Sequence, residues 1–295
     1  MTTNPQEGRT NTYLNDPESG AEMARLLDQD HMLNEAMGGL LPELGDLDSI
    51  HDVLDIACGP GGWVQELAFA YPGIEVTGFD ISQAMIKFAS QQARVQGLDN
   101  AHFLVMDATQ PLQFADNSFD LVNVRTIAGF MRTSMWPQLV KECVRILRPG
   151  GILRMTETDT WGVSNKEAFQ QLINLSYRAA YLTDHSFDPS GQTFGVTALL
   201  ERFLAQAGCQ DIRSRATAIN FSAGAKMHQA MLENLRVFFK LIQSLQLRLR
   251  SQFPDAGIPD QEELDYLYNL MLAEMLSEDF AAIFYLLTVW GCKPS

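Results

Sequence analysis

The chain has 295 residues, of which 46% are apolar, enough for a buried core, so disorder is excluded as its main state. It carries 21 Lys and Arg against 36 Asp and Glu, a net charge of −15, and no basic stripe is visible, which argues against nucleic acid or an anionic membrane as a partner. The four cysteines lie far apart, which disfavours a zinc site or a disulfide framework and favours a reducing, cytoplasmic setting.

Both ends of the chain favour the same setting. The polar start MTTNPQEGRTNTY lacks the apolar stretch of a signal peptide. The apolar run FAAIFYLLTVW, residues 280–290, is too short to span a bilayer. We therefore expect a cytoplasmic globular protein.

Residues 1–48 are expected to form an N-terminal helical lid. Asp16-Pro17-Glu18 is typical of a helix start, because Asp caps the helix and Pro suits its first position. Apolar residues at near-helical spacing continue from Met23 to Met37, and Gly38-Gly39 ends the helix.

From Ile50 onward, short apolar runs alternate with helical patterns. Strands are expected at Asp52–Ala57, Glu75–Asp80, Ala101–Met106, Phe119–Arg125 and Gly151–Thr156, with helices between them. This alternation predicts a parallel sheet with right-handed crossovers. Runs such as VLDIA, apolar on both faces, indicate strands covered by helices on both sides.

Beyond Thr156 two helical inserts interrupt the sheet. The first, residues 160–194, combines an amphipathic helix with a polar loop, and a strand is expected at 211–221. The second, residues 223–279, contains two long helical patterns. The expected core therefore comprises residues 49–222 and 280–295, and the run at 280–290 is its last strand.

The stretch VLDIACGPGGW, residues 53–63, follows a strand and opens a helix. Gly59 and Gly61 allow a tight turn and a close approach of a ligand to the backbone. A dinucleotide fingerprint would require a third glycine at position 64, which is Val, and there is no Gly-Lys-Ser/Thr of a P-loop. The glycine turn alone is a weak signal.

Three acids strengthen this signal. Asp80 ends the second strand, 80 − 61 = 19 residues after Gly61, where a carboxylate can bind both hydroxyls of a ribose. Asp107 follows the third strand, where it can accept a hydrogen bond from the amine of adenine. With Asp55 they mark the carboxyl ends of adjacent strands, where open α/β sheets bind ligands. Each acid alone would be read as a helix cap or a solvated loop residue, but together with the glycine turn they predict a nucleoside site.

These motifs resemble the class I S-adenosylmethionine-dependent methyltransferases. The resemblance rests on VLDIACGPGG, GFD, MDATQPLQFADNSFDLV and LRPGG, and it is close from Ile50 to Thr156 and looser to the C-terminus. It implies a Rossmann-like α/β fold with a seven-stranded sheet, an antiparallel last strand, an N-terminal helical lid and helical inserts. It also implies S-adenosyl-L-methionine, which carries no phosphate, as the cofactor. It implies no metal site.

The resemblance further implies a set of cofactor-binding residues. The glycine turn would meet the methionine part, Asp80 the ribose, and Asp107 with Ala108 the adenine. Ala57 stands where many members of that family have glycine. Arg125 would lie beside the cofactor, and a role in a structural ion pair is an equal alternative for it. The full set is Tyr13, as part of the lid, with Asp55, Ala57, Gly59, Gly61, Asp80, Ile81, Asp107, Ala108 and Arg125.

The acceptor site is expected above the strand ends. In the first insert, His185 is the candidate general base, although a solvated polar loop explains it as well. Tyr177, Tyr181, Asp184 and, on the N-terminal helix, His31 are weaker candidates for acceptor contacts. The apolar faces of residues 223–279 are expected to form core or a homodimer interface, or to admit a bulky acceptor such as a polyketide, terpenoid or quinone-like ring.

We therefore predict methyl transfer from S-adenosylmethionine to O, N or C of a small, fairly apolar molecule of secondary metabolism. One alternative is a cyclase or isomerase that keeps the cofactor without transferring its methyl group. Another is an inactive partner with the same fold, which the intact glycine turn and acids argue against.

Overall fold

The structure, a computed structural model, describes residues 20–295. The expected helix start at Asp16 and the candidate lid residue Tyr13 lie outside these residues. Helix α1 (Gly20–Met37) ends as predicted, because Gly38 and Gly39 both take positive φ angles.

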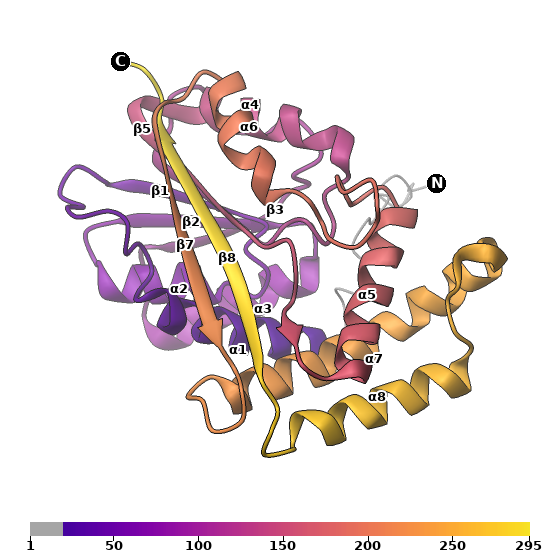
Figure 1. The fold of residues 1–295 in the computed structure, drawn as a ribbon. Helices are drawn as coiled ribbons and strands as arrows, with labels where there is room; N and C mark the ends of the chain where they lie inside the picture. Colours follow the sequence, from indigo (N-terminus) through magenta and orange to yellow (C-terminus); the bar gives the residue numbers. More distant parts are fainter. Residues whose placement is uncertain (1–19) are drawn as a thin grey trace, which may run out of the picture.

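A single twisted sheet forms the centre of the molecule (Figure 1). Its strands are β1 (Asp52–Ile56), β2 (Glu75–Asp80), β3 (Ala101–Val105), β4 (Phe119–Arg125), β5 (Leu147–Glu157), β6 (Val163–Ser164), β7 (Gln210–Asn220) and β8 (Ala282–Cys292). The order is β3-β2-β1-β4-β5-β8, with β7 on the far side of β8. Strands β1 to β5 pair in parallel, whereas β8 runs antiparallel to β5 and β7, so the predicted fold class is confirmed.

Two details of the sheet differ from expectation. The two-residue strand β6 pairs with the start of β8, beyond the stretch of β8 that pairs with β5. Strand β5 begins at Leu147 rather than Gly151, so the LRPGG turn is part of the strand. Leu147 pairs with Phe119 of β4. The glycines pair with the C-terminus, since Gly150 N–H donates to Lys293 O and Lys293 N–H donates to Gly151 O, both at 2.8 Å.

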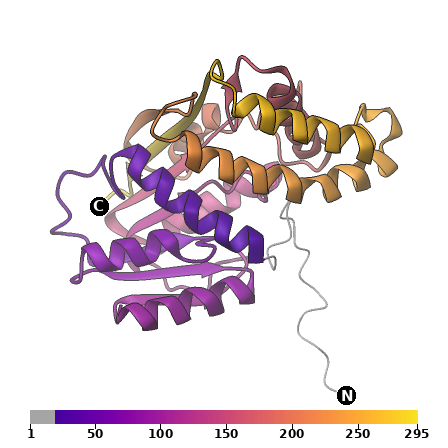
Figure 2. The ribbon, with the colours of Figure 1, turned by 90° about the horizontal axis from the view of Figure 1, so that it is seen from below.

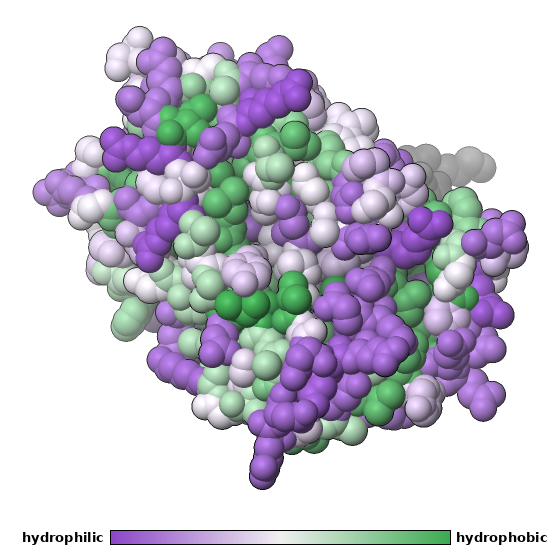
Figure 3. Space-filling model, in the orientation of Figure 1, coloured by the Kyte–Doolittle hydropathy of each residue, from purple (hydrophilic) through white to green (hydrophobic). Residues whose placement is uncertain are grey.

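Helices cover both faces of the sheet (Figure 1). One face carries α1, α2 (Gly62–Ala70) and α3 (Gln83–Gln96), and the other carries α4 (Trp136–Ile146) and α6 (Leu200–Gln206). The strands alternate accordingly, since Val53 packs in one hydrophobic cluster with α2 and Leu54 packs in another with α4. The edge strand β7 is mostly exposed, and Figure 3 shows apolar and hydrophilic side chains interspersed on the face that β7 and β8 cross.

The remaining helices pack beside one end of the sheet. They are α5 (Glu167–Leu182), α7 (His228–Gln252) and α8 (Gln261–Met275). Helix α7 lies between α1 and α8 (Figure 2), and it contacts α1, α5 and α8. Among residues 20–295, no helix is both long and apolar enough to cross a membrane.

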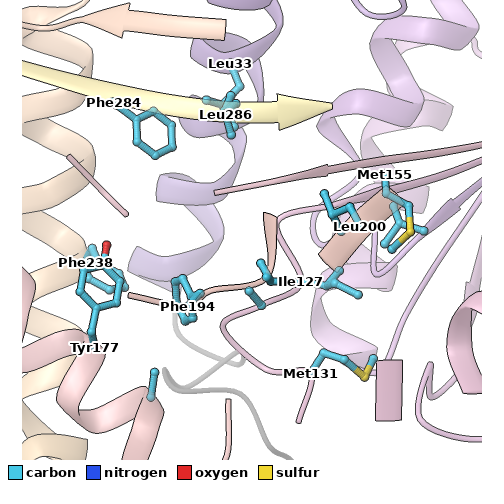
Figure 4. Packing of buried hydrophobic residues seen from close by; sticks show 14 of the residues in the cluster. Leu33, Ile127, Met131, Met155, Tyr177, Phe194, Leu200, Phe238, Phe284 and Leu286 are labelled. Carbon is cyan, nitrogen blue, oxygen red and sulfur yellow. The ribbon is translucent and has the colours of Figure 1, made fainter. Parts of the chain in front are cut away.

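The inserted helices share one hydrophobic core with the sheet. Figure 4 shows side chains from both parts: Tyr177 of α5, Phe238 of α7, Phe284 of β8, and Ile127 and Met131 from the segment after β4. All five side chains belong to the same buried cluster. Because this cluster is continuous, the inserts and the sheet are expected to unfold together. The division of the chain into a lid, a core and inserts stays a prediction.

Candidate cofactor site and active site

A cleft opens at the carboxyl ends of β1, β2, β3 and β4, and it holds about 1000 Å³ of empty space with its open mouth included. The predicted cofactor residues in its lining are Asp55, Ala57, Gly59, Asp80, Ile81, Asp107, Ala108 and Arg125. Helix α1 contributes Leu26, Gln29 and Asp30 to the same lining. The segment after β4 contributes Thr126 and Phe130. The topology therefore brings together the predicted residues at four strand ends. It adds residues of α1 that the sequence did not predict as cofactor residues.

The glycine turn at the base of the cleft has left-handed backbone. Gly59 and Gly61 have φ angles of +53° and +80°, and Ala57 has +56°, which accounts for the glycine that many members of the family carry at that position. Gly61 is not part of the cleft lining. A Cβ there would lie 2.5 Å from Cε1 of Phe103, so this glycine serves the packing of α2 against β3.

Two of the predicted acids are held by backbone groups close to them. Asp80 accepts from Gly59 N–H at 3.0 Å through Oδ2 and from Ser82 N–H at 2.8 Å through Oδ1. Asp107 accepts from both the N–H and the hydroxyl of Thr109, at 2.8 and 2.7 Å. These hydrogen bonds orient both carboxylates in the lining of the cleft.

The N-terminus of α2 is occupied by a side chain of the protein itself. Asp30 of α1 lies over Gly62, where a Cβ would come within 2.7 Å of Oδ2, and it accepts a hydrogen bond from Trp63 N–H. In dinucleotide-binding sheets this helix end holds a pyrophosphate. Since a carboxylate stands there, the cleft suits a ligand without a phosphate at this position.

Asp30 also pairs with Arg125 at the end of β4. The guanidinium donates through Nη2 to Asp30 and through Nη1 to Asn34 Oδ1, the latter at 2.6 Å. The alternative reading of Arg125 as an ion-pair residue is therefore realised, in a position that still lines the cleft. Burial nevertheless keeps the pKa of Asp30 above its ordinary value, against the lowering effect of Arg125.

Asp55 is a second buried acid of the cleft. Burial raises its pKa to about 7, although the charge of Arg125 and a 2.7 Å hydrogen bond from Asn123 Nδ2 oppose the rise. A cation that enters the cleft would favour the ionised form of Asp55. The electrostatics of the site therefore suit a positively charged ligand group near Asp30 and Asp55.

Two candidate acceptor residues are buried outside the cleft lining. His185 is 3% exposed, and its Nδ1 lies 2.9 Å from the hydroxyl of Thr183. Tyr177 is 1% exposed and accepts a hydrogen bond from Trp161 N–H, and burial raises its pKa. Neither side chain is brought to the strand ends, and the role of each stays a prediction.

The other three acceptor candidates lie on the surface. Asp184 accepts from the hydroxyl of Thr133 at 2.7 Å, and Tyr181 stacks with Arg178, whose Cζ is 5.5 Å from the ring centroid. The side chain of His31 is 77% exposed, with Nδ1 3.5 Å from Glu66. None of the three lines the cleft, and their roles also stay predictions.

The residues of α1 were missed by the sequence prediction as cleft residues. Leu26, Gln29 and Asp30 sit among ordinary helical positions, so periodicity does not mark them. The one available signal was Gly62, a glycine beyond those that the turn requires, which indicates a close neighbour. Among residues 20–295, no cluster of three or more His, Cys, Asp and Glu side chains is arranged to hold a metal ion.

Comparison with known proteins agrees with this geometry. Residues 53–151 match the family described as "Methyltransferase domain". The demethylmenaquinone methyltransferase of Geobacillus kaustophilus is 37% identical over 106 residues, which cover 36% of this chain and 44% of that protein. The demethylmenaquinone methyltransferase of Listeria welshimeri is 31% identical over 128 residues, which cover 43% of this chain and 52% of that protein. The chain thus spans about half the length of the curated relatives it matches.

Solved structures share the fold at low identity. Phosphoethanolamine N-methyltransferase 2 of Haemonchus contortus, in complex with S-adenosyl-L-methionine, gives a TM-score of 0.53 at 19% identity, covering 94% of this chain and 57% of that one. The YcgJ protein of Bacillus subtilis gives a TM-score of 0.53 at 17% identity, and the match covers 88% of this chain and 99% of that one. The match over residues 53–151, the sheet order and the cleft agree with a resemblance to the class I S-adenosylmethionine-dependent methyltransferases.

Proposed function

We propose that the protein transfers the methyl group of S-adenosyl-L-methionine to O, N or C of a small, fairly apolar acceptor. The observation that carries the proposal is the cleft itself. Asp55, Asp80 and Asp107 surround it at three adjacent strand ends, while Asp30 occupies the position where a pyrophosphate would otherwise bind. This arrangement suits a nucleoside that carries a cation and no phosphate.

The residues present fit each part of the cofactor. Asp80 would accept from the ribose hydroxyls and Asp107 from the adenine amine, because both carboxylates line the cleft at the ends of neighbouring strands. Asp55 would bind the α-ammonium of the methionine part. Gly59, with no Cβ, would allow the ligand to approach the backbone. Tyr13 lies outside the described residues, and its place over the methionine carboxylate stays a prediction.

When bound, S-adenosylmethionine supplies a sulfonium whose methyl group is readily transferred. The protein's part is then to orient the acceptor and to exclude water, and positioning alone can lower a barrier by several kcal/mol. Leu26, Gln29, Thr126 and Phe130 also line the cleft and are the residues that we expect to do so. His185 lies away from this lining, so a base role for it would require the acceptor to extend beyond the cleft.

An apolar acceptor is supported by two observations. Leu26 and Phe130 add apolar side chains to the lining of the cleft. Arg125, the cation of the lining, is already paired with Asp30, so an anionic acceptor would find no unpaired partner among the described lining residues. The relatives named demethylmenaquinone methyltransferases suggest a quinone-like ring as the first class to test.

The remaining expectations are part of the proposal. A role in secondary metabolism and a cytoplasmic setting stay predictions. A homodimer through residues 223–279 would use the outer face of α8, where Tyr266 and Leu270 are 65% and 37% exposed. Analytical ultracentrifugation of the purified protein measures that association directly.

The test is turnover with methyl-labelled S-adenosylmethionine and a panel of hydroquinones, phenols and amines. We expect S-adenosylhomocysteine and labelled product to form in equal amounts with at least one class, and the Asp80→Ala protein to form neither at the same cofactor concentration. An acceptor that is rearranged while the cofactor stays intact would instead support the cyclase or isomerase alternative. A wild-type protein that binds no S-adenosylhomocysteine would refute the proposal.

A further inference from the structure

Three buried polar side chains lie side by side across the middle of the sheet. Asp55 of β1 is in register with Asn123 of β4, and Asn123 is in register with Arg154 of β5. Paired residues of neighbouring strands point to the same face, so the three side chains form a row. Asn123 and Arg154 are fully buried, and only Asp55 reaches the cleft.

The row is joined by hydrogen bonds whose direction is set at one end. Arg154 Nη1 donates to Asn123 Oδ1 at 2.7 Å, and Asn123 Nδ2 donates to Asp55 Oδ1, also at 2.7 Å. A guanidinium can only donate, so Arg154 forces the amide oxygen of Asn123 toward itself. The amide nitrogen is thereby turned to Asp55, and one oxygen of Asp55 is committed to it.

Glu43, from the connection between α1 and β1, anchors the far end of the row. Its Oε1 accepts from Nε and Nη2 of Arg154, at 3.0 and 2.8 Å. The two side chains are 0% and 1% exposed. A buried pair of this kind is costly to desolvate and is weak evidence for stability by itself. The Glu43–Arg154 pair adjoins a row that ends in the cleft, which suggests that the pair orients the row rather than stabilises the fold.

We propose that Glu43, Arg154 and Asn123 are positioning residues that hold Asp55 in the orientation that binds the α-ammonium of the cofactor's methionine part. The row occupies Oδ1 of Asp55 and leaves Oδ2 for the ligand. This inference rests on the proposed function, because it requires an amino-acid cofactor in the cleft. It extends that function to three residues that do not line the cleft.

The charges around Asp55 support the assignment. Its pKa of about 7 is kept from rising further by the hydrogen bond from Asn123 and by the charges of Arg125 and Arg154, while Asp30 raises it. The titratable or charged groups facing Asp55 are Asp30 of α1, Arg125 of β4, Arg154 of β5 and Cys58 of the glycine turn. Loss of the Asn123 donor would leave the ionised form less stabilised and shift the ionisation of Asp55 to higher pH.

The test compares two ligands by isothermal titration calorimetry. S-adenosylhomocysteine carries the α-ammonium, whereas 5′-methylthioadenosine keeps the adenosine and thioether and lacks the amino-acid part. In Asn123→Leu, we expect affinity for S-adenosylhomocysteine to fall about tenfold and affinity for methylthioadenosine to stay within about twofold of wild type. The pH at which S-adenosylhomocysteine affinity is half of its plateau should also rise, by about one unit.

A second variant guards against misfolding caused by an unpaired buried ion. The double variant Glu43→Leu/Arg154→Met removes both charges together, and apolar replacement of a buried pair is often tolerated. Its affinity for S-adenosylhomocysteine alone should fall, about two- to tenfold, because the amide of Asn123 is no longer oriented. The matched control is Thr156→Val/Thr288→Val, which removes a buried 2.9 Å hydroxyl pair between β5 and β8 that is not joined to Asp55, and which should not change the ratio of the two affinities.

The outcomes are distinct. A loss confined to S-adenosylhomocysteine, with the pH shift, supports the row as a positioning device. If the variants lose affinity for both ligands equally, or keep their affinity for both, the proposal is overturned. If the wild-type protein binds neither ligand, the proposed function fails as well, and this result is recognised before any variant is made.

Discussion

The cleft has two walls that hold their polar side chains in different ways. The strand-end wall, here Asp55, Gly59, Asp80 and Asp107, places two of its acids on backbone N–H groups. For Asp80 and Asp107 those donors include residues only two positions further along the chain. This wall is therefore largely a product of local sequence.

The α1 wall, here Leu26, Gln29 and Asp30, depends on residues far away in the chain. Gln29 Oε1 accepts from Arg25 Nη1 at 2.7 Å and from Asn234 Nδ2 of α7 at 3.2 Å. Asp30 is held by Arg125 of β4. Side-chain networks of this kind change together when one member is removed. We therefore expect the strand-end wall to determine cofactor binding and the α1 wall to couple the cleft to α7.

The largest expected effect comes from the strand-end wall. Asp80→Ala would remove the acceptor for two ribose hydroxyls and free the N–H groups of Gly59 and Ser82. Hydrogen bonds to a charged group contribute about 1.5–3 kcal/mol each, so affinity for S-adenosylhomocysteine should fall about 100-fold or more by calorimetry. Unchanged affinity would contradict the assignment of this wall to the cofactor.

The contrast between the walls also explains what the sequence could predict. The sequence places Gly59, Asp80 and Asp107 in the cleft because strand–turn–helix signals and an acid at each strand end are local patterns. Asp30 could not be found in this way, since its role depends on α1 docking over Gly62, a contact of tertiary structure. The row from Asp55 to Glu43 requires the register of β1, β4 and β5, which alternation predicts only as a parallel sheet.

The first insert shows the limit of local patterns from the other side. Its sequence predicts an acceptor site because His185, Tyr177 and Asp184 carry reactive groups within a short span. In the structure Tyr177 and His185 are buried outside the cleft lining, and Asp184 accepts a hydrogen bond from Thr133. The roles of these three residues stay predictions, because proximity along the chain does not establish where the fold places their side chains.

The segment after β4 contributes Thr126 and Phe130 to the cleft lining, and Glu157 of β5 holds this segment by accepting a 2.6 Å hydrogen bond from Ile127 N–H. Burial raises the pKa of Glu157 to about 8, above its unfolded value of 4.5. The folded state therefore binds more protons than the unfolded state between these values, and stability falls as the pH rises through this window.

Glu157→Gln keeps an acceptor for Ile127 and cannot ionise. The fall in unfolding free energy from pH 6 to pH 8 should be smaller in the variant than in wild type, by roughly 2 kcal/mol. Urea unfolding monitored by circular dichroism at both pH values measures the difference. Parallel pH profiles for the two proteins would show that Glu157 does not titrate in this range.

Gly62→Ala tests the contact between the two walls. The added Cβ would lie 2.7 Å from Asp30 Oδ2, so Asp30 must move away from α2. Overpacking costs about 1–3 kcal/mol and the better helix propensity of Ala returns up to about 1, so a net loss of about 1–2 kcal/mol is expected in urea unfolding. In an Asp30→Ala background the same substitution should cost less, and full additivity would exclude the contact.

The smallest expected effect separates the walls most cleanly. Asn234→Ala on α7 removes a partner of Gln29 and Arg25, while Arg25 keeps its 2.6 Å pair with Glu22. We expect a loss of about 1 kcal/mol in unfolding free energy and faster amide hydrogen exchange in α1, because the α1 wall is less firmly held. Affinity for S-adenosylhomocysteine should not change, because the strand-end wall does not use α7.

Lys240→Ala, on the exposed side of the same helix, is the matched control for Asn234→Ala. It removes the surface pair with Asp265, whose two side chains are 56% and 42% exposed, and such pairs contribute at most about 1 kcal/mol. Exchange in α1 should stay at the wild-type rate in this variant. If Asn234→Ala weakened cofactor binding as much as it accelerated exchange in α1, the two walls would be one cooperative unit, and the division of labour between them would be wrong.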